Sequence, residues 1–319
     1  MPFDRRTTLA SPTGATLNLH VRQAEGRPRA IVQINHGLAE HAGRYARFAD
    51  FLATRGMTSY AHDHRGHGLT KAPDAPLGRF AANDGQAKVV ADVVAVHDLI
   101  AEENPGLPVV LFGHSMGALI GLHFLQRHSE RVQAAAIWNA TLTAGLPGRA
   151  AQAILAWERF RLGSDVPSRL LPRLTFRAWG RAVPGHRTLF DWLSRDPEEV
   201  DKYIADPLCG WDPSVSMWRD VFGLIFADAD DANFSEVRRG LPVFLLGGDK
   251  DPSTDYGKAV RHLHGRMTRM GFSNLVSRIY PDTRHESVNE VNRDAIMTDF
   301  AEWAEAVLNP QRLGPSQAS

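Results

Sequence analysis

The sequence predicts an α/β fold built on a mostly parallel sheet with helices on both faces. Two observations lead to this class. Short apolar segments typical of buried strands alternate with amphipathic helical segments over residues 1–138 and again over 241–309. The stretch between them, residues 139–240, breaks the alternation, because it is rich in Arg, Trp and Pro and shows helical fragments without a clear strand. Such alternation favours parallel strands joined by helices, here as a doubly wound core with one insertion.

The predicted elements follow one another with short connections. A β-hairpin is expected first, because residues 7–10 and 16–23 alternate weakly around the turn sequence Ser-Pro-Thr-Gly. Gly56 follows an apolar helical pattern and occupies the position of a C-terminal capping glycine. The sequence further predicts strands at residues 30–35, 57–62, 109–112, 132–138, 243–246 and 275–280, and helices at 44–55, 86–103, 116–128, 256–270 and 293–308.

Residues 139–240 are expected to form a helical cap, or lid, inserted into this core. A connection of roughly 100 residues is far longer than usual, and connections of that length are commonly functional. The polar segment 310–319 is expected to be a loose tail. The predicted organisation is therefore a first core part (1–138), a cap (139–240), a second core part (241–309) and a tail (310–319).

The composition excludes several classes of protein. The chain has 319 residues with 36 basic and 36 acidic side chains, so no overall charge favours nucleic acid as a partner. Cys209 is the only cysteine, which excludes an internal disulfide; the first residues lack the apolar core of a signal peptide, and together these features favour a cytoplasmic protein. The stretch between Glu103 and Arg127 has no charged residue, but its prolines and glycines favour a buried strand and helix over a membrane span. Nothing in the sequence indicates an oligomeric state.

The most informative motif is Gly-His-Ser-Met-Gly at residues 113–117, which has the pattern Gly-x-Ser-x-Gly. An apolar strand-like run precedes it and a helical pattern follows. A serine on a sharp strand-to-helix turn is exposed for attack, and the glycines beside it let neighbouring backbone approach closely. We therefore predict Ser115 as a nucleophile. The alternative is a tight turn that contains a structural serine.

A serine nucleophile needs a general base and an orienting carboxylate, which follow such a motif in the order Ser, acid, His. His285 follows one predicted strand, and Asp249 and Asp251 follow the strand before it. Open α/β sheets build their sites at the carboxyl ends of strands, so we predict His285 as the base. Both acids are candidates for the carboxylate. Asp251 is preferred, because Asp249 directly follows the glycine pair that ends the strand and Pro252 would stiffen the loop that presents Asp251.

An oxyanion hole is expected from two backbone amides. One belongs to Met116, directly after the serine, and the other to Leu38, in the loop after an early strand. His36 in that loop is expected to support it rather than bind a metal. The His- and Asp-rich residues 62–68 invite a metal interpretation as well, but a hydrogen-bonded corner fits better, because no matching set of ligands repeats elsewhere.

These segments together resemble the monoacylglycerol lipase and lysophospholipase branch of the α/β-hydrolases. The resemblance implies the α/β-hydrolase fold with a helical cap, Ser115 as nucleophile, Asp251 as acid, His285 as base, and the amides of Leu38 and Met116 as oxyanion donors, with no cofactor and no metal. Residues 139–240 match poorly apart from 206–208, so preferences for chain length and head group do not carry over. The matching segments, which extend over nearly the whole chain, are residues 36–45, 63–68, 105–108, 113–117, 206–208 and 284–286.

The expected activity is hydrolysis of the carboxylic ester of a single-chain lipid, a monoacylglycerol or a lysophospholipid, through an acyl-enzyme. Two alternatives remain, because fold and triad do not identify the substrate. One keeps the triad but changes the bond, as in a short-chain or aryl esterase acting on soluble substrates, a peptidase or a perhydrolase. The other is a non-catalytic binding protein on the same scaffold. A small-molecule ester or lipid is the expected partner.

The predicted cap has a local excess of positive charge. Residues 149–187 contain eight arginines and two acids, interleaved with Trp, Phe, Leu and Ile. Basic residues beside large apolar ones are typical of helices that lie on an anionic membrane, which would make the protein peripherally membrane-bound. The alternative is a cap whose apolar residues pack on the core while its arginines are solvated.

Overall fold

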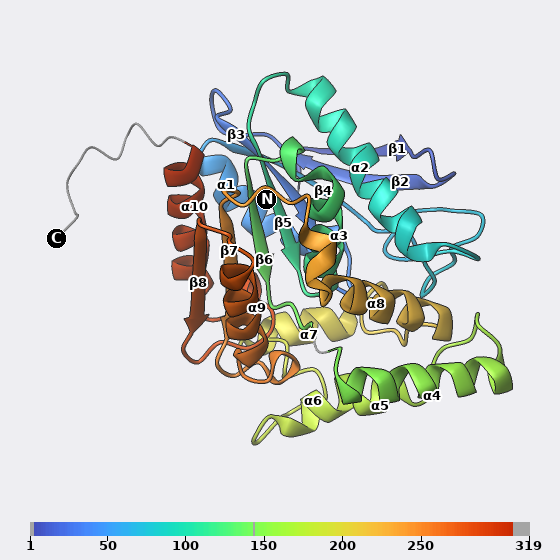
Figure 1. Cartoon of the computed structure of the whole chain (residues 1–319). Coiled ribbons are helices and arrows are strands. Elements are labelled where there is room, and N and C mark those ends of the chain that lie inside the picture. Colours follow the sequence, from blue (N-terminus) through green and yellow to red (C-terminus); the bar gives the residue numbers. More distant parts are fainter. Residues whose placement is uncertain (1–2, 143, 309–319) are drawn as a thin grey trace.

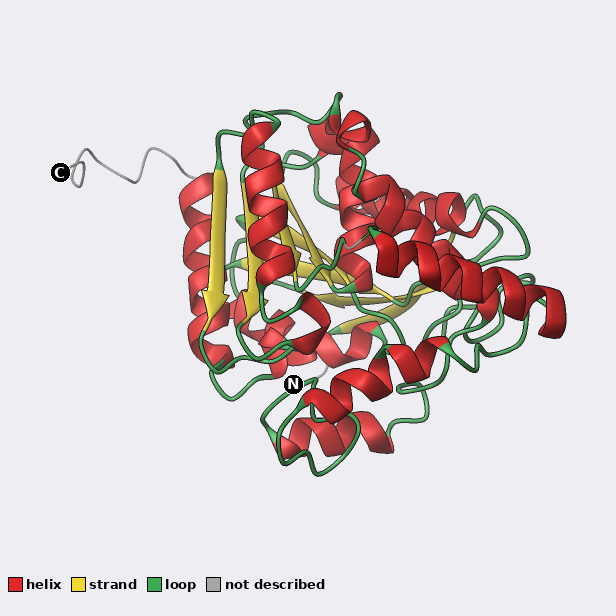
Figure 2. Cartoon of the chain, turned by 60° about the horizontal axis from the view of Figure 1, so that its bottom comes forward, coloured by secondary structure: helices red, strands yellow, loops and turns green. Residues whose placement is uncertain are grey.

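The computed structural model describes residues 3–142 and 144–308, in which eight strands form one twisted sheet between two layers of helices (Figures 1 and 2). The order across the sheet is β1-β2-β4-β3-β5-β6-β7-β8. The strands are β1 (Arg5–Ala10), β2 (Thr16–Arg22), β3 (Ala30–Asn35), β4 (Met57–His62), β5 (Val109–His114), β6 (Ala134–Trp138), β7 (Val243–Gly248) and β8 (Leu275–Tyr280).

The sheet is mostly parallel, as the alternation of elements predicts. The hairpin β1–β2 is antiparallel, and β2 pairs antiparallel with β4. Every other neighbouring pair is parallel, from β4–β3 to β7–β8. The carboxyl ends of β3, β5, β6, β7 and β8 therefore lie at the same edge of the sheet, where loops from distant parts of the chain can meet.

Helices cover both faces because alternate side chains of a strand point to opposite faces. In β5, Leu111 belongs to an apolar cluster with α2, α3 and α9, whereas Phe112 belongs to a second cluster with α1 and α10. The ring of Phe112 lies 5.1 Å from Phe48 of α1 and 5.9 Å from Phe300 of α10. These helices are α1 (Ala46–Thr54), α2 (Gly85–Glu103), α3 (Met116–His128), α9 (Lys258–Arg269) and α10 (Arg293–Leu308).

Residues 139–240, called the helical segment below, connect β6 to β7 and gather at one end of the sheet (Figure 1). This segment is helical in the described residues. Its helices are α4 (Leu146–Leu162), α5 (Leu171–Leu174), α6 (Phe176–Ala182), α7 (Pro197–Ala205) and α8 (Val215–Asp228). The predicted tail, residues 310–319, lies outside the described residues.

The uncharged stretch between Glu103 and Arg127 contains the buried strand β5 and most of α3, as predicted. Within the two described ranges, no helix combines the length and the apolar composition that crossing a bilayer requires.

Several element boundaries differ from the predicted ones for local reasons. The helix expected at 44–55 begins as a 3₁₀ turn (Ala42–Tyr45) before α1, and Gly56 follows with φ +72°, which confirms its capping role. Helix α9 starts two residues later than expected, because Asp255 and Tyr256 both have a left-handed backbone. Strand β7 extends through the glycine pair to Gly248.

Candidate active site

Ser115 lies at the turn between β5 and α3, in a backbone conformation that L-residues rarely adopt, with φ 54° and ψ −117°. A Cβ atom on Gly117 would lie 2.1 Å from the carbonyl oxygen of Asn35, and one on Gly113 would lie 2.4 Å from the carbonyl oxygen of Gly117. Both positions therefore require glycine. The Ser115 N–H donates to the carbonyl oxygen of Trp138 at 2.9 Å, which ties the turn to β6. The predicted strand–turn–helix context of Ser115 is confirmed.

His285 lies after β8 and meets the carboxylate of Asp251, with Nδ1 2.9 Å from Oδ2. Asp251 is fully buried and has further donors: Asn139 Nδ2 reaches Oδ2 at 3.0 Å, and the amide and hydroxyl of Ser253 reach Oδ1 at 2.9 and 2.7 Å. Burial alone would raise the pKa of Asp251, but His285 and these donors hold it below its usual value. An ionised carboxylate only accepts, so His285 Nδ1 carries the proton and Nε2 can accept one.

Of the two acid candidates, the structure brings Asp251 and not Asp249 to His285. Asp251 caps the short 3₁₀ turn Pro252–Thr254, which turns its carboxylate toward the loop after β8. Asp249 directly follows β7, and its N–H donates to the carbonyl oxygen of Tyr280. Its Oδ1 is buried without a hydrogen-bond partner in the described part of the chain.

The two predicted oxyanion donors lie on the wall of one cavity with Ser115. Leu38 belongs to the loop after β3, and Met116 begins α3. His36 supports this loop: the N–H of His64 donates to its Nε2 at 2.9 Å, so Nδ1 carries the proton and donates to the carbonyl oxygen of Gly37 at 2.7 Å. The supporting role expected for His36 is thus confirmed.

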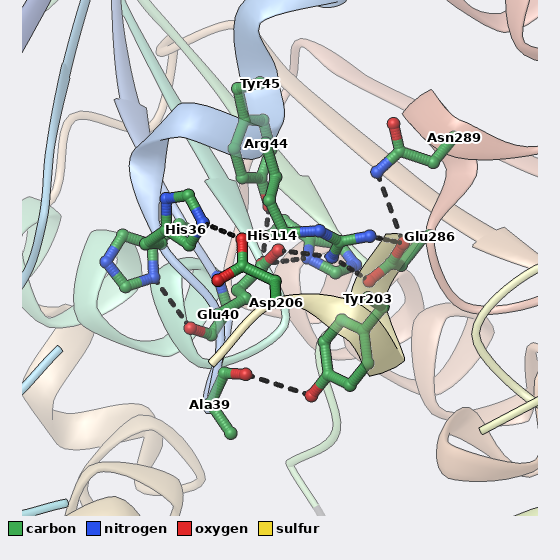
Figure 3. Close-up of polar contacts among 12 residues, drawn as sticks. His36, Ala39, Glu40, Arg44, Tyr45, His114, Tyr203, Asp206, Glu286 and Asn289 are labelled. Atoms are coloured by element: carbon green, nitrogen blue, oxygen red, sulfur yellow. Dashed lines mark hydrogen bonds and ion pairs between the residues drawn. The ribbon is translucent and has the colours of Figure 1, made fainter. Parts of the chain in front are cut away.

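A buried ion cluster, the Glu40 cluster, lies beside the cavity and consists of Glu40, Arg44, Tyr45, His114 and Glu286 (Figure 3). Glu40 accepts from Arg44 and from the Tyr45 hydroxyl, each at 2.9 Å, and Arg44 also pairs bidentately with Glu286. Burial alone would raise the pKa of Glu40, but His114 and Arg44 hold it well below its usual value. The cluster is therefore charged and paired, as buried ions must be.

The Glu40 cluster also connects the loops that carry the predicted site residues. The N–H of Gly37, next to Leu38, donates to Glu40 Oε1 at 2.5 Å. His114, next to Ser115, places Nδ1 3.4 Å from the same oxygen and donates through Nε2 to the carbonyl oxygen of His285 at 3.0 Å. Burial alone would lower the pKa of His114, yet Glu40 raises it above its usual value. One carboxylate thus links the loops after β3, β5 and β8.

The helical segment contacts two of these loops. The Tyr203 hydroxyl of α7 and the N–H of Gly210 both donate to the carbonyl oxygen of Ala39 at 2.9 Å. On the other side, the ring of Trp192 lies 4.8 Å from the ring of His285, and the backbone of residues 192–193 accepts hydrogen bonds from residues 285–286. The segment is therefore packed directly against the site.

The His- and Asp-rich residues after β4 form the hydrogen-bonded corner expected from the sequence. Asp63 accepts from the N–H groups of Ala42 and Leu69 and from the Asn18 amide. Three histidines, His62, His64 and His67, pack around this corner with His36. Burial lowers the pKa of His62 and of His67 to about 3, so both rings are neutral near pH 7.

In the described ranges, one group has donor atoms close enough together to hold a metal ion, namely His41, Asp206 and Cys209, whose donor atoms lie within 4.8 Å of one another. Nδ1 of His41 accepts the N–H of Gly43, so Nε2 carries the proton and donates to Asp206 at 2.9 Å. Burial raises the pKa of the Cys209 thiol. A metal would have to displace both protons, and we interpret the group as a contact between the loop after β3 and the helical segment.

Ser115, His285, Leu38 and Met116 share a cavity of about 520 Å³ between the sheet edge and the helical segment. Most of its wall is apolar and comes from α3, α4, α5, α6 and α8, and its polar lining includes Ser115, Ser253 and His285. The apolar lining includes Leu119, Ala151, Ile154, Leu171, Leu174, Phe176, Trp179, Trp218, Val221, Phe222 and Ile225.

A known protein family matches most of the chain. The family model Hydrolase_4, described as "Serine aminopeptidase, S33", covers residues 26–292, which include every predicted site residue. The chain belongs to this family.

Among the similar proteins are three hydrolases that this chain matches over most of their length. Monoacylglycerol lipase of Mycolicibacterium smegmatis is 27% identical over 283 residues, which cover 86% of this chain and 88% of that protein. Monoglyceride lipase of Mus musculus is 28% identical over 301 residues, with 92% and 90% covered. A carboxyl esterase from Bacillus coagulans, solved in complex with glycerol, is 22% identical and superposes with a TM-score of 0.85 over 97% of this chain and 99% of its own. The chain thus has the α/β-hydrolase fold and resembles monoacylglycerol lipases.

The sequence did not indicate several polar residues at the site of this hydrolase. Asn139 and Ser253 hold Asp251, and Arg44 and Glu286 pair in the Glu40 cluster. Asn139 follows a strand directly, in a left-handed backbone that asparagine tolerates, which is a signal a sequence could carry. Ser253 meets His285, which lies 32 residues further along the chain, and Arg44 meets Glu286, which lies 242 residues further along. No local sequence pattern encodes contacts over such separations.

The buried histidines predict how stability changes with acid. The unfolded chain binds protons at His62 and His67 near pH 6.5, whereas the folded protein does so only near pH 3. Protonation of the two histidines in the unfolded chain therefore lowers the free energy of unfolding as the pH drops below 6.5, by about 2 kcal/mol per histidine at pH 5. Above pH 6.5 this loss is absent. We expect His62→Leu to lose less free energy of unfolding than the parent protein between pH 7 and pH 5, measured by urea denaturation. The control is His262→Gln, at an exposed histidine, whose free energy of unfolding should change with pH as it does in the parent protein. If His62→Leu loses as much free energy of unfolding as the parent between pH 7 and pH 5, this account is wrong.

Proposed function

We propose that the protein is a serine hydrolase that cleaves the carboxylic ester of a single-chain lipid, such as a monoacylglycerol or a lysophospholipid. One observation carries the proposal: Ser115, on its strand-to-helix turn, and His285, hydrogen-bonded to Asp251, line the same largely apolar cavity. The names of the relatives from Mycolicibacterium smegmatis and Mus musculus support the substrate class.

The proposed reaction has two halves. His285 Nε2 takes the proton of the Ser115 hydroxyl while Oγ attacks the ester carbonyl carbon, and His285 then protonates the leaving alcohol. Water, activated by the same nitrogen, attacks the acyl-enzyme and releases the carboxylic acid and free Ser115. Asp251 orients the ring and stabilises the imidazolium that forms in each half.

The amides of Leu38 and Met116 are proposed to bind the oxyanion of each tetrahedral intermediate. Loss of one such donor typically costs about 3 kcal/mol of barrier. The Glu40 cluster supports this role, because Glu40 holds the N–H of Gly37 beside Leu38 and, through His114, the turn that carries Ser115 and Met116. In this proposal, Glu40 helps to hold both donors in position before substrate binds, through the residues next to them.

The cavity supports a substrate with one long apolar group. A volume of about 520 Å³ lies within the range of roughly 300–1,000 Å³ for small-molecule sites. Its apolar wall would hold an acyl chain, and its polar end near Ser115 the ester and the alcohol. In this proposal the helical segment acts as a cap that supplies much of the acyl-chain wall.

The first test concerns the nucleophile and the base. Ser115→Ala and His285→Ala should each lower kcat on a p-nitrophenyl ester by about 10⁴- to 10⁶-fold, since neither group can be replaced in the proposed cycle. Circular dichroism should show an unchanged fold, and Ser235→Ala, at an exposed serine, should keep full activity. More than a few per cent of activity in either active-site variant would contradict the proposal.

A second test separates the two acids. Asp251→Asn should lower kcat by about 10⁴-fold, because an asparagine can hold the wrong tautomer of His285. Asp249→Asn should change kcat less than threefold, since Asp249 has no contact with His285 among the contacts of the described residues. Steady-state kinetics of the two variants decide the question, and the reverse pattern would assign the carboxylate role to Asp249.

A substrate panel tests the bond and the chain. Monoacylglycerols and lysophospholipids should be hydrolysed with higher kcat/KM than di- and triacylglycerols, because the proposal places a single acyl chain in the cavity. A preference for short p-nitrophenyl or aryl esters would instead make the protein an esterase of soluble substrates, and cleavage of aminoacyl p-nitroanilides would favour the activity in the family's description. Absence of all turnover with intact fold would favour a binding protein.

We also propose that the cap meets anionic lipid. On α4, Leu146, Trp157 and Phe160 lie along one exposed stripe, next to the face of the helix that lines the cavity through Ala151 and Ile154. Phe160 is 89% exposed and Leu146 82%, which is unusual for large apolar side chains. Exposed arginines flank the stripe, and the guanidinium of Arg161 lies 4.9 Å from the centre of the Trp157 ring. An apolar stripe with basic neighbours is suited to a membrane surface.

Vesicle binding tests this surface. The protein should co-sediment with vesicles of anionic phosphatidylglycerol at low salt and dissociate as salt rises. Phe160→Ser should weaken binding. The double variant Arg169→Gln/Arg173→Gln changes two exposed arginines that follow α4 in the same segment, and it should weaken binding by about 10- to 30-fold at roughly 1 kcal/mol per arginine. Activity on a soluble short-chain ester should stay unchanged in both. If the parent protein does not bind at low salt, the cap serves soluble substrates.

A further inference from the structure

Ser253 lies two residues after Asp251, within the 3₁₀ turn Pro252–Thr254, and lines the cavity. Its Oγ lies 2.7 Å from Asp251 Oδ1 and 2.8 Å from His285 Nδ1. We propose that Ser253 is a positioning residue, whose hydroxyl bridges the carboxylate and the imidazole and acts as a second acceptor for the Nδ1 proton of His285. This inference rests on the proposed function, in which His285 is the general base.

The direction of both hydrogen bonds follows from the chemistry of the three groups. Asp251 is ionised and can only accept, so the single hydroxyl proton of Ser253 is donated to Oδ1. The lone pairs of Oγ are then left to accept from the Nδ1–H of His285. That proton is shared between Asp251 Oδ2 at 2.9 Å and Ser253 Oγ at 2.8 Å. His285 therefore has two acceptors on one side of its ring.

The position of the hydroxyl is held by the backbone around it. The N–H of Ser253 donates to Asp251 Oδ1 at 2.9 Å, and the carbonyl oxygen of Ser253 accepts from the Thr141 hydroxyl at 2.6 Å. Asn139 donates to the other carboxylate oxygen, which prevents Asp251 from turning away. Ser253 is buried, with 8% of its surface exposed, so little water competes for these bonds.

Two acceptors matter most when the ring is charged. In each transition state of the proposed cycle His285 becomes an imidazolium, and hydrogen bonds to a charged donor are stronger than those to a neutral one. The oxygen of Ser253 therefore stabilises the transition state more than the resting enzyme, which is the condition for a faster chemical step. It also fixes the proton on Nδ1, so that Nε2 stays available to Ser115.

The test uses three variants of Ser253. Ser253→Ala removes the hydroxyl. Ser253→Thr and Ser253→Val form a matched pair, because they add the same bulk and differ in the hydroxyl. We expect kcat on a soluble p-nitrophenyl ester to fall about 3- to 10-fold in the alanine and valine variants, the size typical of one hydrogen bond, with KM within twofold of the parent. The threonine variant should recover most of the rate that the valine variant loses.

The pH profile separates a role at the base from a merely structural one. Loss of the second acceptor makes the imidazolium less stable, so the acid limb of kcat/KM should move to lower pH, by about half a unit, in the alanine and valine variants. The threonine variant should keep the parent limb. In proton NMR, the deshielded Nδ1 proton of His285, assigned by its loss in His285→Ala, should shift in the valine variant and not in the threonine variant. The NMR measurement does not depend on turnover.

Several outcomes would overturn the inference: parent kcat and acid limb in both the alanine and valine variants, equal impairment in threonine and valine, or an unchanged Nδ1 resonance in the valine variant. Ser115→Ala is measured beside them. If Ser115→Ala remains active, the proposed function itself fails. If it is inactive while Ser253→Val matches the parent, only the role of Ser253 fails.

Discussion

The left-handed backbone at Ser115 is the constraint on which the rest of the site depends. A non-glycine residue in such a conformation costs of order 1–3 kcal/mol and persists only when its surroundings over-determine it. Here the surroundings are β3, β5, β6 and α3, which approach so closely that Gly113 and Gly117 have no room for a Cβ atom. The packing of the sheet therefore stabilises the turn, and the turn places the serine hydroxyl at the wall of the cavity instead of in the core.

The buried Glu40 cluster connects this turn to the rest of the site. The carboxylate of Glu40 accepts the N–H of Gly37 and lies beside His114, which in turn donates to the carbonyl oxygen of His285. Paired buried charges contribute little net stability, but loss of one partner leaves the other uncompensated, so the cluster holds a defined geometry. The helical segment joins the same loops through Tyr203 and Trp192. A displacement of that segment would therefore act on the loop after β3, which carries Leu38, and on the loop of His285 together.

Local patterns in the sequence predicted the fold class, the strand–turn–helix around Ser115 and the placement of His285 after the last strand. These features depend on short-range hydrophobic periodicity and on glycine sterics, which a single sequence encodes directly. The choice of Asp251 over Asp249 needed the resemblance and the loop argument, and the structure brings Asp251 to His285. The Glu40 cluster and the bridge made by Ser253 were missed, because their members come from loops that meet only through the parallel sheet. Element ends shifted where residues such as Asp255 and Tyr256 adopt left-handed backbone that the helical pattern of their neighbours conceals.

The central claim is that Ser115 is the nucleophile of a serine hydrolase, and covalent labelling tests it most directly. The protein is treated with a fluorophosphonate probe, digested and analysed by mass spectrometry to locate the adduct. The account predicts one stoichiometric adduct on Ser115, abolished by prior heat denaturation and strongly slowed in His285→Ala, because the probe reacts only with an activated serine. An adduct on another serine, or no adduct on the folded protein, would contradict the account.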